Sequence, residues 1–154
     1  MSYDVLFNLV NLSVLPAWAL LIFSPKWSLT DKIVHSMLYP LLLGAIYIGG
    51  FAMVIFAGHG ADGDGFTSID GVRALFASDA GILIGWTHYL VFDLFVGAWA
   101  ARDAKRRGFS HWLLVPCLVF TLMAGPVGLV LYLVLRKMTG KGGWRLEDTK
   151  LPLR

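Results

Sequence analysis

Residues 85–103 read GWTHYLVFDLFVGAWAARD, and this stretch decides what kind of protein the chain is. It is apolar and long enough to form most of a membrane-spanning helix, for which about 20 residues are needed. Yet His88 and Asp93 lie inside the apolar run. An ionisable group inside a membrane span is costly and therefore needs a partner or a function. We expect both side chains to face the interior of a helical bundle.

The composition of the whole chain agrees with a membrane protein. Of its 154 residues, 57% are hydrophobic and only 15% are charged, and the mean hydropathy is +0.69. A soluble domain has about 25% charged residues. The lysines and arginines collect at the ends of the apolar runs, as a bilayer requires. The net positive charge therefore gives no reason to expect a nucleic-acid partner.

Four apolar runs reach spanning length: residues 5–23, 33–57, 80–101 and 113–135. Because the bilayer core offers no water, each must be a helix. We predict an all-α fold, a polytopic membrane bundle of four transmembrane helices. Residues 1–137 form the membrane domain, and residues 138–154 form a basic flexible tail. Four residues of the second connection recur at helical spacing and predict a short interfacial helix there: Ile69, Val72, Leu75 and Phe76.

Several details of this architecture stay open at the level of sequence. With four spans, the lysines and arginines divide six against seven between the two membrane faces, so the positive-inside rule does not decide the orientation. The short loops lean towards the cytoplasm. Thr30 or Asp31 is expected to cap the second helix. The oligomeric state is not indicated.

The polar residues of the spans form stripes. Gly85, Tyr89, Asp93 and Gly97 are spaced by four and share one helix face, and the glycines let a neighbouring helix come close. His88 lies about 100° round the same helix. On the first span, Asn8, Asn11 and Trp18 lie roughly on one face. A site built from both spans is the resulting hypothesis.

Structural interpretations stand beside the functional ones. Asparagines in spans often only join helices, and aromatic residues of an apolar chain mostly pack or anchor. Asp93 could form an ion pair, for example with Arg102. His59 and His111 fall in connections, where we expect them to be solvated. No HExxH, P-loop or clustered-histidine motif occurs, and we therefore expect no metal and no cofactor.

Three stretches resemble a known family: LFNLVNLSVLPAWALLIFSPKW, GWTHYLVFDLFVGAWAARD and LVPCLVFTLMAGPVGLVLYLVLR. Together they are similar to the abscisic acid deficient 4-like membrane proteins, the family of plant neoxanthin synthase. The pattern W-x-H-Y-x-x-x-D-L-x-x-G in the second stretch is fairly specific. The resemblance implies a four-span protein of carotenoid metabolism. In plants the family converts violaxanthin to neoxanthin by opening an epoxide to an allene.

Two functions follow from these expectations. The first is a cofactor-free carotenoid or isoprenoid isomerase, in which Asp93 and either His88 or Tyr89 supply the acid and the base. We assign substrate binding to six residues: Asn8, Asn11, Trp18, Gly85, Trp86 and Gly97. The second is a non-catalytic binder of a carotenoid or lipid. Because no plastid transit peptide is evident, we expect a bacterial protein of the inner membrane.

Overall fold

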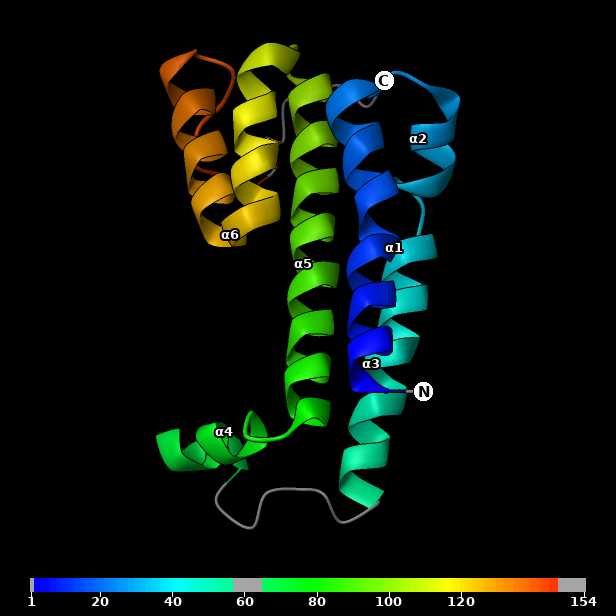
Figure 1. The fold of residues 1–154 in the computed structure, drawn as a ribbon. Coiled ribbons are helices and arrows are strands. Elements are labelled where there is room, and N and C mark those ends of the chain that lie inside the picture. Colours follow the sequence, from blue (N-terminus) through cyan, green and yellow to red (C-terminus); the bar gives the residue numbers. More distant parts are fainter. Residues whose placement is uncertain (1, 57–64, 147–154) are drawn as a thin grey trace. The chain divides into compact units, whose positions relative to one another are not determined.

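The computed structural model describes residues 2–56 and 65–146, and all the regular structure in these ranges is helical. The elements are α1 (Tyr3–Phe23), α2 (Ser28–Ile33), α3 (Leu38–Phe56), the 3-10 turn η1 (Gly65–Thr67), α4 (Ile69–Leu75), α5 (Asp79–Arg106) and α6 (His111–Met138) (Figure 1). Within these described ranges, four helical segments are long and apolar enough to cross a membrane: Tyr3–Phe23, Ser28–Val54, Asp79–Arg106 and His111–Met138. The predicted all-α fold with four helices of spanning length is confirmed.

The second of these segments is interrupted where the sequence predicted one helix. Residues 34–37 separate α2 from α3. Pro40 lies in the first turn of α3, where its ring does not clash with a helical carbonyl four residues earlier. Thr30 lies inside α2 rather than capping it, and its hydroxyl donates to Ser24 O at 2.6 Å.

A short helix lies in the second connection, as its apolar spacing predicted. Ser68 caps α4, since its Oγ accepts a hydrogen bond of 3.0 Å from the backbone N–H of Gly71. Whether α4 lies at a membrane interface stays a prediction. The glycine-rich start of this connection, His59 included, lies outside the described residues.

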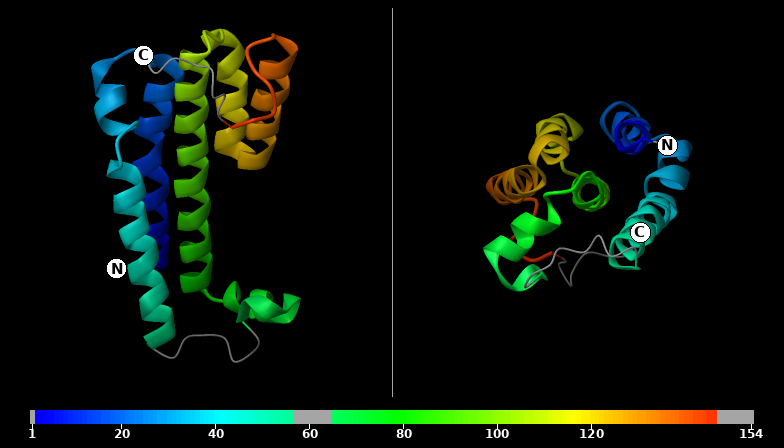
Figure 2. Two further views of the ribbon diagram at one scale, coloured as in Figure 1. Left: turned by 180° about the vertical axis from the view of Figure 1, so that it is seen from behind. Right: turned by 60° about the horizontal axis from the view of Figure 1, so that its bottom comes forward.

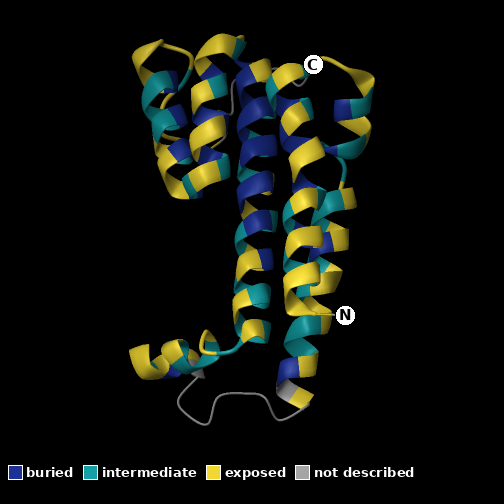
Figure 3. Ribbon diagram, in the orientation of Figure 1, coloured by how far each residue is buried: buried dark blue, intermediate teal, exposed yellow. Residues whose placement is uncertain are grey.

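The chain forms two compact units. Unit 1 contains Met1–Leu15 and Met37–Val91, and unit 2 contains Pro16–Ser36 and Phe92–Arg154. The long helices α1 and α5 contribute residues to both. Many large apolar side chains of the long helices are exposed, among them Leu12, Leu41, Phe92 and Met123 (Figure 3). Exposed apolar faces of this extent suit a lipid environment.

Within unit 2, α6 bends back on itself. Ala124 has φ −161° and ψ 77°, which breaks the helix just before Gly125 and Pro126. Residues 111–123 and 125–138 then lie side by side (Figures 1 and 2). A Cβ added at Gly128 would lie only 2.5 Å from Cys117 O, eleven residues earlier. In a straight helix, two residues eleven positions apart are separated by about 16 Å along the helix axis.

Candidate functional site

Unit 1 contains a cavity of about 270 Å³ that two of the candidate residues line. His88 and Gly85 of α5 line it, and the imidazole of His88 lies 5.5 Å from the ring of Tyr47 between centroids. The other walls are apolar or aromatic: Phe51, Val54, Phe66, Leu75, Phe76, Gly81 and Ile84. Such a lining, apolar with one imidazole and one phenol, is typical of a site for an apolar ligand that carries an oxygen.

Gly85 is required at its position by a neighbouring ring. A Cβ at this residue would lie 2.8 Å from Cζ of Phe76, the residue that directly follows α4. Gly85 thus allows a close approach, but its partner is a phenyl ring of the second connection and not the neighbouring helix that the sequence predicted. This contact places α4 against the start of α5 and closes one side of the cavity.

Aromatic residues of α1 and α5 form a second feature of unit 1. The indole of Trp86 stacks on Tyr89 at 5.1 Å and contacts Phe7 at 5.7 Å between ring centroids. Its Nε1 donates a 2.7 Å hydrogen bond to Asn11 Oδ1. Asn11 thus joins two helices through its side chain, whereas Asn8 is exposed. The two asparagines that were expected to share one face of α1 therefore have different environments: Asn11 bonds to Trp86, and Asn8 is exposed.

A second cavity of about 270 Å³ adjoins the first, since Val54 and Ile84 line both. Its remaining walls come from α1, α3 and α5: Tyr3, Leu6, Val10, Ile46, Gly50, Met53, Ala80, Leu83 and Thr87. The hydroxyl of Thr87 donates to Leu83 O at 2.8 Å. This cavity therefore offers an almost wholly hydrocarbon surface.

The remaining candidates, Trp18, Asp93 and Gly97, belong to unit 2. Asp93 is only 8% exposed, and a Cβ at Gly125 would overlap its carboxylate. Its side chain therefore lies directly against the bend of α6. A Cβ at Gly97 would lie 2.6 Å from Cη2 of Trp18, whose side chain is buried. The role of these residues in one site with His88 and Tyr89 stays a prediction.

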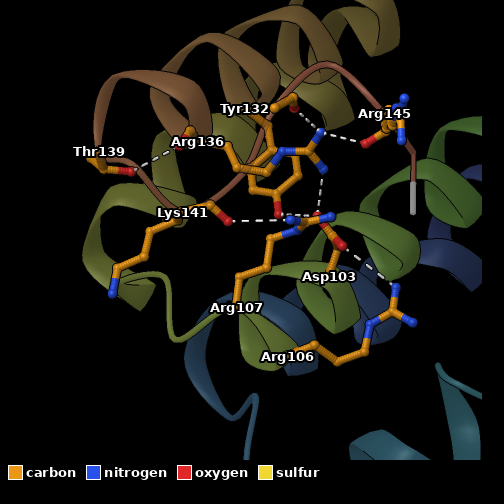
Figure 4. Close-up of polar contacts among 9 residues, drawn as sticks. Asp103, Arg106, Arg107, Tyr132, Arg136, Thr139, Lys141 and Arg145 are labelled. Carbon is orange, nitrogen blue, oxygen red and sulfur yellow. Dashed lines mark hydrogen bonds and ion pairs between the residues drawn. The ribbon is translucent and has the colours of Figure 1, made fainter. Parts of the chain in front are cut away.

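Sequence reasoning missed a buried charged cluster in unit 2, which we name the Asp103 cluster. It comprises Asp103, Arg107, Tyr132 and Arg136 (Figure 4). Oδ2 of Asp103 accepts hydrogen bonds from Arg107 Nε at 2.7 Å, from Tyr132 Oη at 2.7 Å and from Arg136 Nη1 at 2.6 Å. The spacing of Asp103 and Arg107, four residues apart, was the available signal, but residues 102–112 were interpreted as a connection.

The Asp103 cluster also holds the segment that follows α6. Arg136 Nη2 donates to Gly143 O at 2.5 Å and to Arg145 O at 2.8 Å, while Arg107 Nη1 donates to Lys141 O at 3.2 Å. The first residues of the expected flexible tail thus have defined contacts. Residues 147–154 lie outside the described part of the chain.

His111 has a different environment from the one expected. It begins α6, and its Nε2 lies 2.8 Å from Ile22 O, the penultimate residue of α1. The prediction that it is a solvated loop residue was wrong. Among the described residues, no three His, Cys, Asp or Glu side chains lie close enough together to hold a metal ion.

Comparison with known proteins bears on identity and on location. No solved structure matches the chain significantly. Protein ABA DEFICIENT 4, chloroplastic, of Arabidopsis thaliana is 28% identical over a region that covers 79% of this chain and 56% of that protein. The chain thus spans little more than half the length of this relative. Because the relative is a chloroplastic plant protein, it points to a plastid membrane, and the prediction of a bacterial inner membrane was wrong.

The family resemblance is confirmed over most of the chain. The sequence profile of the ABA DEFICIENT 4-like family matches residues 5–132. The matched region contains most of α1, all of α3 and α5, and the bend of α6. It therefore includes the first cavity of unit 1, the second cavity apart from Tyr3, and the contact between Asp93 and Gly125. The chain belongs to the ABA DEFICIENT 4-like family.

Proposed function

We propose that this chain is an integral membrane protein of carotenoid or isoprenoid metabolism, and that it acts as a cofactor-free isomerase on an oxygenated carotenoid. Family membership supports the carotenoid substrate class. The apolar exposed faces of four helices of spanning length support a location in the bilayer. A substrate dissolved in the membrane can reach such a protein without passing through water.

The observation that carries the proposal is the aromatic cavity beside His88. At about 270 Å³, it lies near the lower limit of ligand pockets, which enclose roughly 300–1,000 Å³. A pocket of this size holds one end group of a long molecule rather than all of it. The imidazole of His88 and the phenol of Tyr47 lie 5.5 Å apart between ring centroids, so an oxygen on that end group would meet a polar side chain.

The chemistry of the proposed step needs only proton transfers. An acid protonates the epoxide oxygen as its C–O bond breaks, and a base removes a proton from a neighbouring carbon of the chain. The electron pair of the C–H bond forms the second double bond of the allene. Product and substrate have the same mass, and no oxidant or reductant is consumed. The sequence prediction assigns one of the two groups to Asp93 and the other to His88 or Tyr89, and of these three residues His88 lines the aromatic cavity.

A second candidate function is a non-catalytic binder of a carotenoid or lipid. One observation favours it, namely the contact of the Asp93 carboxylate with Gly125 at the bend of α6. Irregular backbone within a membrane must be buried in protein, and a carboxylate against this bend has a structural use. In this function Asp93 stabilises the fold and no substrate is converted.

The test is pigment analysis in a bacterial host that makes zeaxanthin and violaxanthin. Strains carry the wild-type chain, Asp93→Asn, Asp93→Glu, His88→Gln or the empty vector. Asp79→Asn is the matched control, because Asp79 lies in the first turn of the same helix. Chromatography with mass spectrometry detects any new pigment. Immunoblots and thermal melts of the purified proteins establish that each variant is present and folded.

An isomer of violaxanthin in the wild-type and Asp79→Asn strains, lost in folded Asp93→Asn and reduced in His88→Gln, supports the enzyme. Folded Asp93→Asn with full turnover refutes the role of Asp93. Unchanged pigments in all strains, with violaxanthin retained on the purified wild-type protein, support the binder. Unchanged pigments without retained pigment contradict violaxanthin isomerisation and carotenoid binding.

A further inference from the structure

The strongest remaining feature is the bend of α6. Length and composition alone would allow residues 111–138 to cross a membrane once. The bend instead leaves two helical halves of about 13 residues each, which corresponds to roughly 20 Å per half. The hydrocarbon core of a bilayer is about 30 Å thick, and apolar helices of 10–14 residues are typical of re-entrant segments. Neither half is long enough to cross by itself.

Contacts inside unit 2 show that both ends of α6 lie beside the end of α5. Tyr132 and Arg136, from the second half, donate hydrogen bonds to Asp103 near the end of α5. The ring of Tyr132 also contacts Phe109, two residues before α6 begins, at 5.6 Å between centroids. The second half of α6 therefore begins at the bend, away from the end of α5, and ends beside the end of α5.

The tip of α6, at the bend, has the features of a segment that lies in the membrane interior. Gly125 is buried at the bend, next to the carboxylate of Asp93. A helix N-terminus carries partial positive charge and favours a neighbouring anion. Met123 and Val127, on either side, are 72% and 54% exposed. An apolar exposed tip whose irregular backbone is covered by protein is compatible with the membrane interior.

We infer that α6 is a re-entrant hairpin that enters and leaves the membrane on one side, and that the basic face it completes binds anionic lipid headgroups. This inference rests on the membrane location in the proposed function. The three remaining crossings then place the first and third connections and the C-terminal segment on one side. The N-terminus and the second connection lie on the other side.

This topology decides the membrane orientation, which the distribution of lysines and arginines over four crossings did not. Twelve of the thirteen lysines and arginines lie on the side of the third connection, and only Arg73 lies opposite. With four crossings the division was six against seven. The positive-inside rule now places the basic face in the cytoplasm or in the compartment that corresponds to it.

Much of the basic face is available to lipid. Among the described residues, its exposed members belong to unit 2: Lys26, Lys32, Lys105, Arg106, Lys137, Lys141 and Arg145. The buried Asp103 cluster fixes the segment that carries Lys141 and Arg145 against the helix ends. Basic groups near a membrane surface attract anionic headgroups. The structure thus presents an ordered cationic surface at the level of the headgroups.

The first experiment maps topology with single cysteines. Cys117→Ala removes the one native cysteine, and cysteines are then placed at exposed positions: Ile69, Ser110, Met123 and Leu146. A membrane-impermeant maleimide is applied to intact cells and to inverted vesicles. We expect Ser110→Cys and Leu146→Cys to react from one side, Ile69→Cys from the other, and Met123→Cys from neither.

Labelling of Leu146→Cys from the side of Ile69→Cys would overturn the re-entrant hairpin while leaving the proposed function intact. Extraction of the wild-type chain from membranes by alkaline carbonate would instead refute the membrane location, and this proposal with it. C-terminal reporter fusions provide a second determination that does not depend on Cys117→Ala.

The second experiment measures headgroup binding. The purified protein is melted in micelles containing either phosphatidylglycerol or phosphatidylcholine. We expect phosphatidylglycerol to raise the melting midpoint of the wild type and of Arg73→Gln, and to have less effect on a Lys137→Gln, Lys141→Gln, Arg145→Gln triple variant. Equal responses of the triple variant and the wild type would contradict the headgroup surface. Free glycerol phosphate should leave all midpoints unchanged, and stabilisation by it would assign the surface to soluble anions instead.

Discussion

Arg136 Nη1 lies 2.6 Å from Asp103 Oδ2, and the two side chains are 0% and 1% exposed. The pair joins the second half of α6 to the end of α5. Arg107 and Tyr132 bind the same carboxylate oxygen. A single acidic side chain thus joins the end of α5, the second half of α6 and, through Arg107 and Arg136, the residues that follow α6.

Asp103→Asn should destabilise the protein strongly. The substitution preserves the shape of the side chain but leaves the guanidinium groups of Arg107 and Arg136 without their counter-charge. Removing one partner of a buried ion pair costs about 3–5 kcal/mol. Thermal or denaturant unfolding in detergent measures the loss. Asp70→Asn is the control, because the pair of Asp70 with Arg73 is exposed; a similar loss in both variants would contradict the importance of burial.

Arg136→Lys should release the segment after α6. A lysine cannot reproduce the planar geometry with which Arg136 binds Asp103, Gly143 O and Arg145 O together. Hydrogen exchange at residues 141–146 should become faster by about tenfold or more. Arg145→Ala should leave exchange nearly unchanged, because Arg145 contributes its carbonyl to this contact. Unaltered exchange in Arg136→Lys would show that other contacts hold the segment.

Gly125→Ala should destabilise the bend of α6 through Asp93. The new Cβ would overlap the carboxylate, and overpacking costs about 1–3 kcal/mol. In an Asp93→Ala background the same substitution should cost less, because the overlapping atoms are gone. Unfolding free energies of the four proteins in this cycle give the coupling. Additive effects of the two substitutions would contradict the contact.

Gly50→Leu should weaken binding of a long carotenoid but not of a small cyclic fragment. A Cβ at Gly50 would lie 3.0 Å from Cγ1 of Ile84, and the longer side chain would fill the hydrocarbon cavity. We expect at least about a tenfold rise in Kd for zeaxanthin, or about 1.4 kcal/mol, measured by tryptophan quenching.

The matched control for this prediction is Gly49→Leu. A Cβ at Gly49 meets no described atom within 4 Å, so this variant should bind zeaxanthin as the wild type does. The fragment 3-hydroxy-β-ionone tests the aromatic cavity alone and should bind Gly50→Leu normally. Equal weakening of both ligands would indicate a general disturbance of unit 1 instead of a filled cavity.

Asn11→Leu should lower stability by about 1 kcal/mol, the typical contribution of one hydrogen bond. The substitution removes the acceptor of Trp86 Nε1 and should also shift the fluorescence of that indole. Asn8→Leu should have no such cost, because Asn8 is exposed. The two single variants are compared by denaturant unfolding. An equal loss in both would indicate that the asparagines act through a shared feature of α1.

The candidate site was predictable in part because helix periodicity is a local property. The spacing of Gly85, Trp86 and His88 placed them near one another on α5, and the structure gathers these residues with Asn11 in unit 1. Phe76 and Phe66 of the aromatic cavity could not be predicted. They come from the second connection, whose return against α5 depends on tertiary contacts such as that between Phe76 and Gly85.

The sequence by itself determined that the chain is helical and suited to a membrane. Long apolar runs must satisfy their own backbone hydrogen bonds in a bilayer, and this requirement is met within each run. The tertiary structure decided the break before α3, the course of α6 and the burial of Asp103. Proline and glycine permit a bend without fixing its direction, and a charged residue becomes buried only where distant partners reach it. Those partners, Tyr132 and Arg136, meet Asp103 because α6 turns back at Ala124.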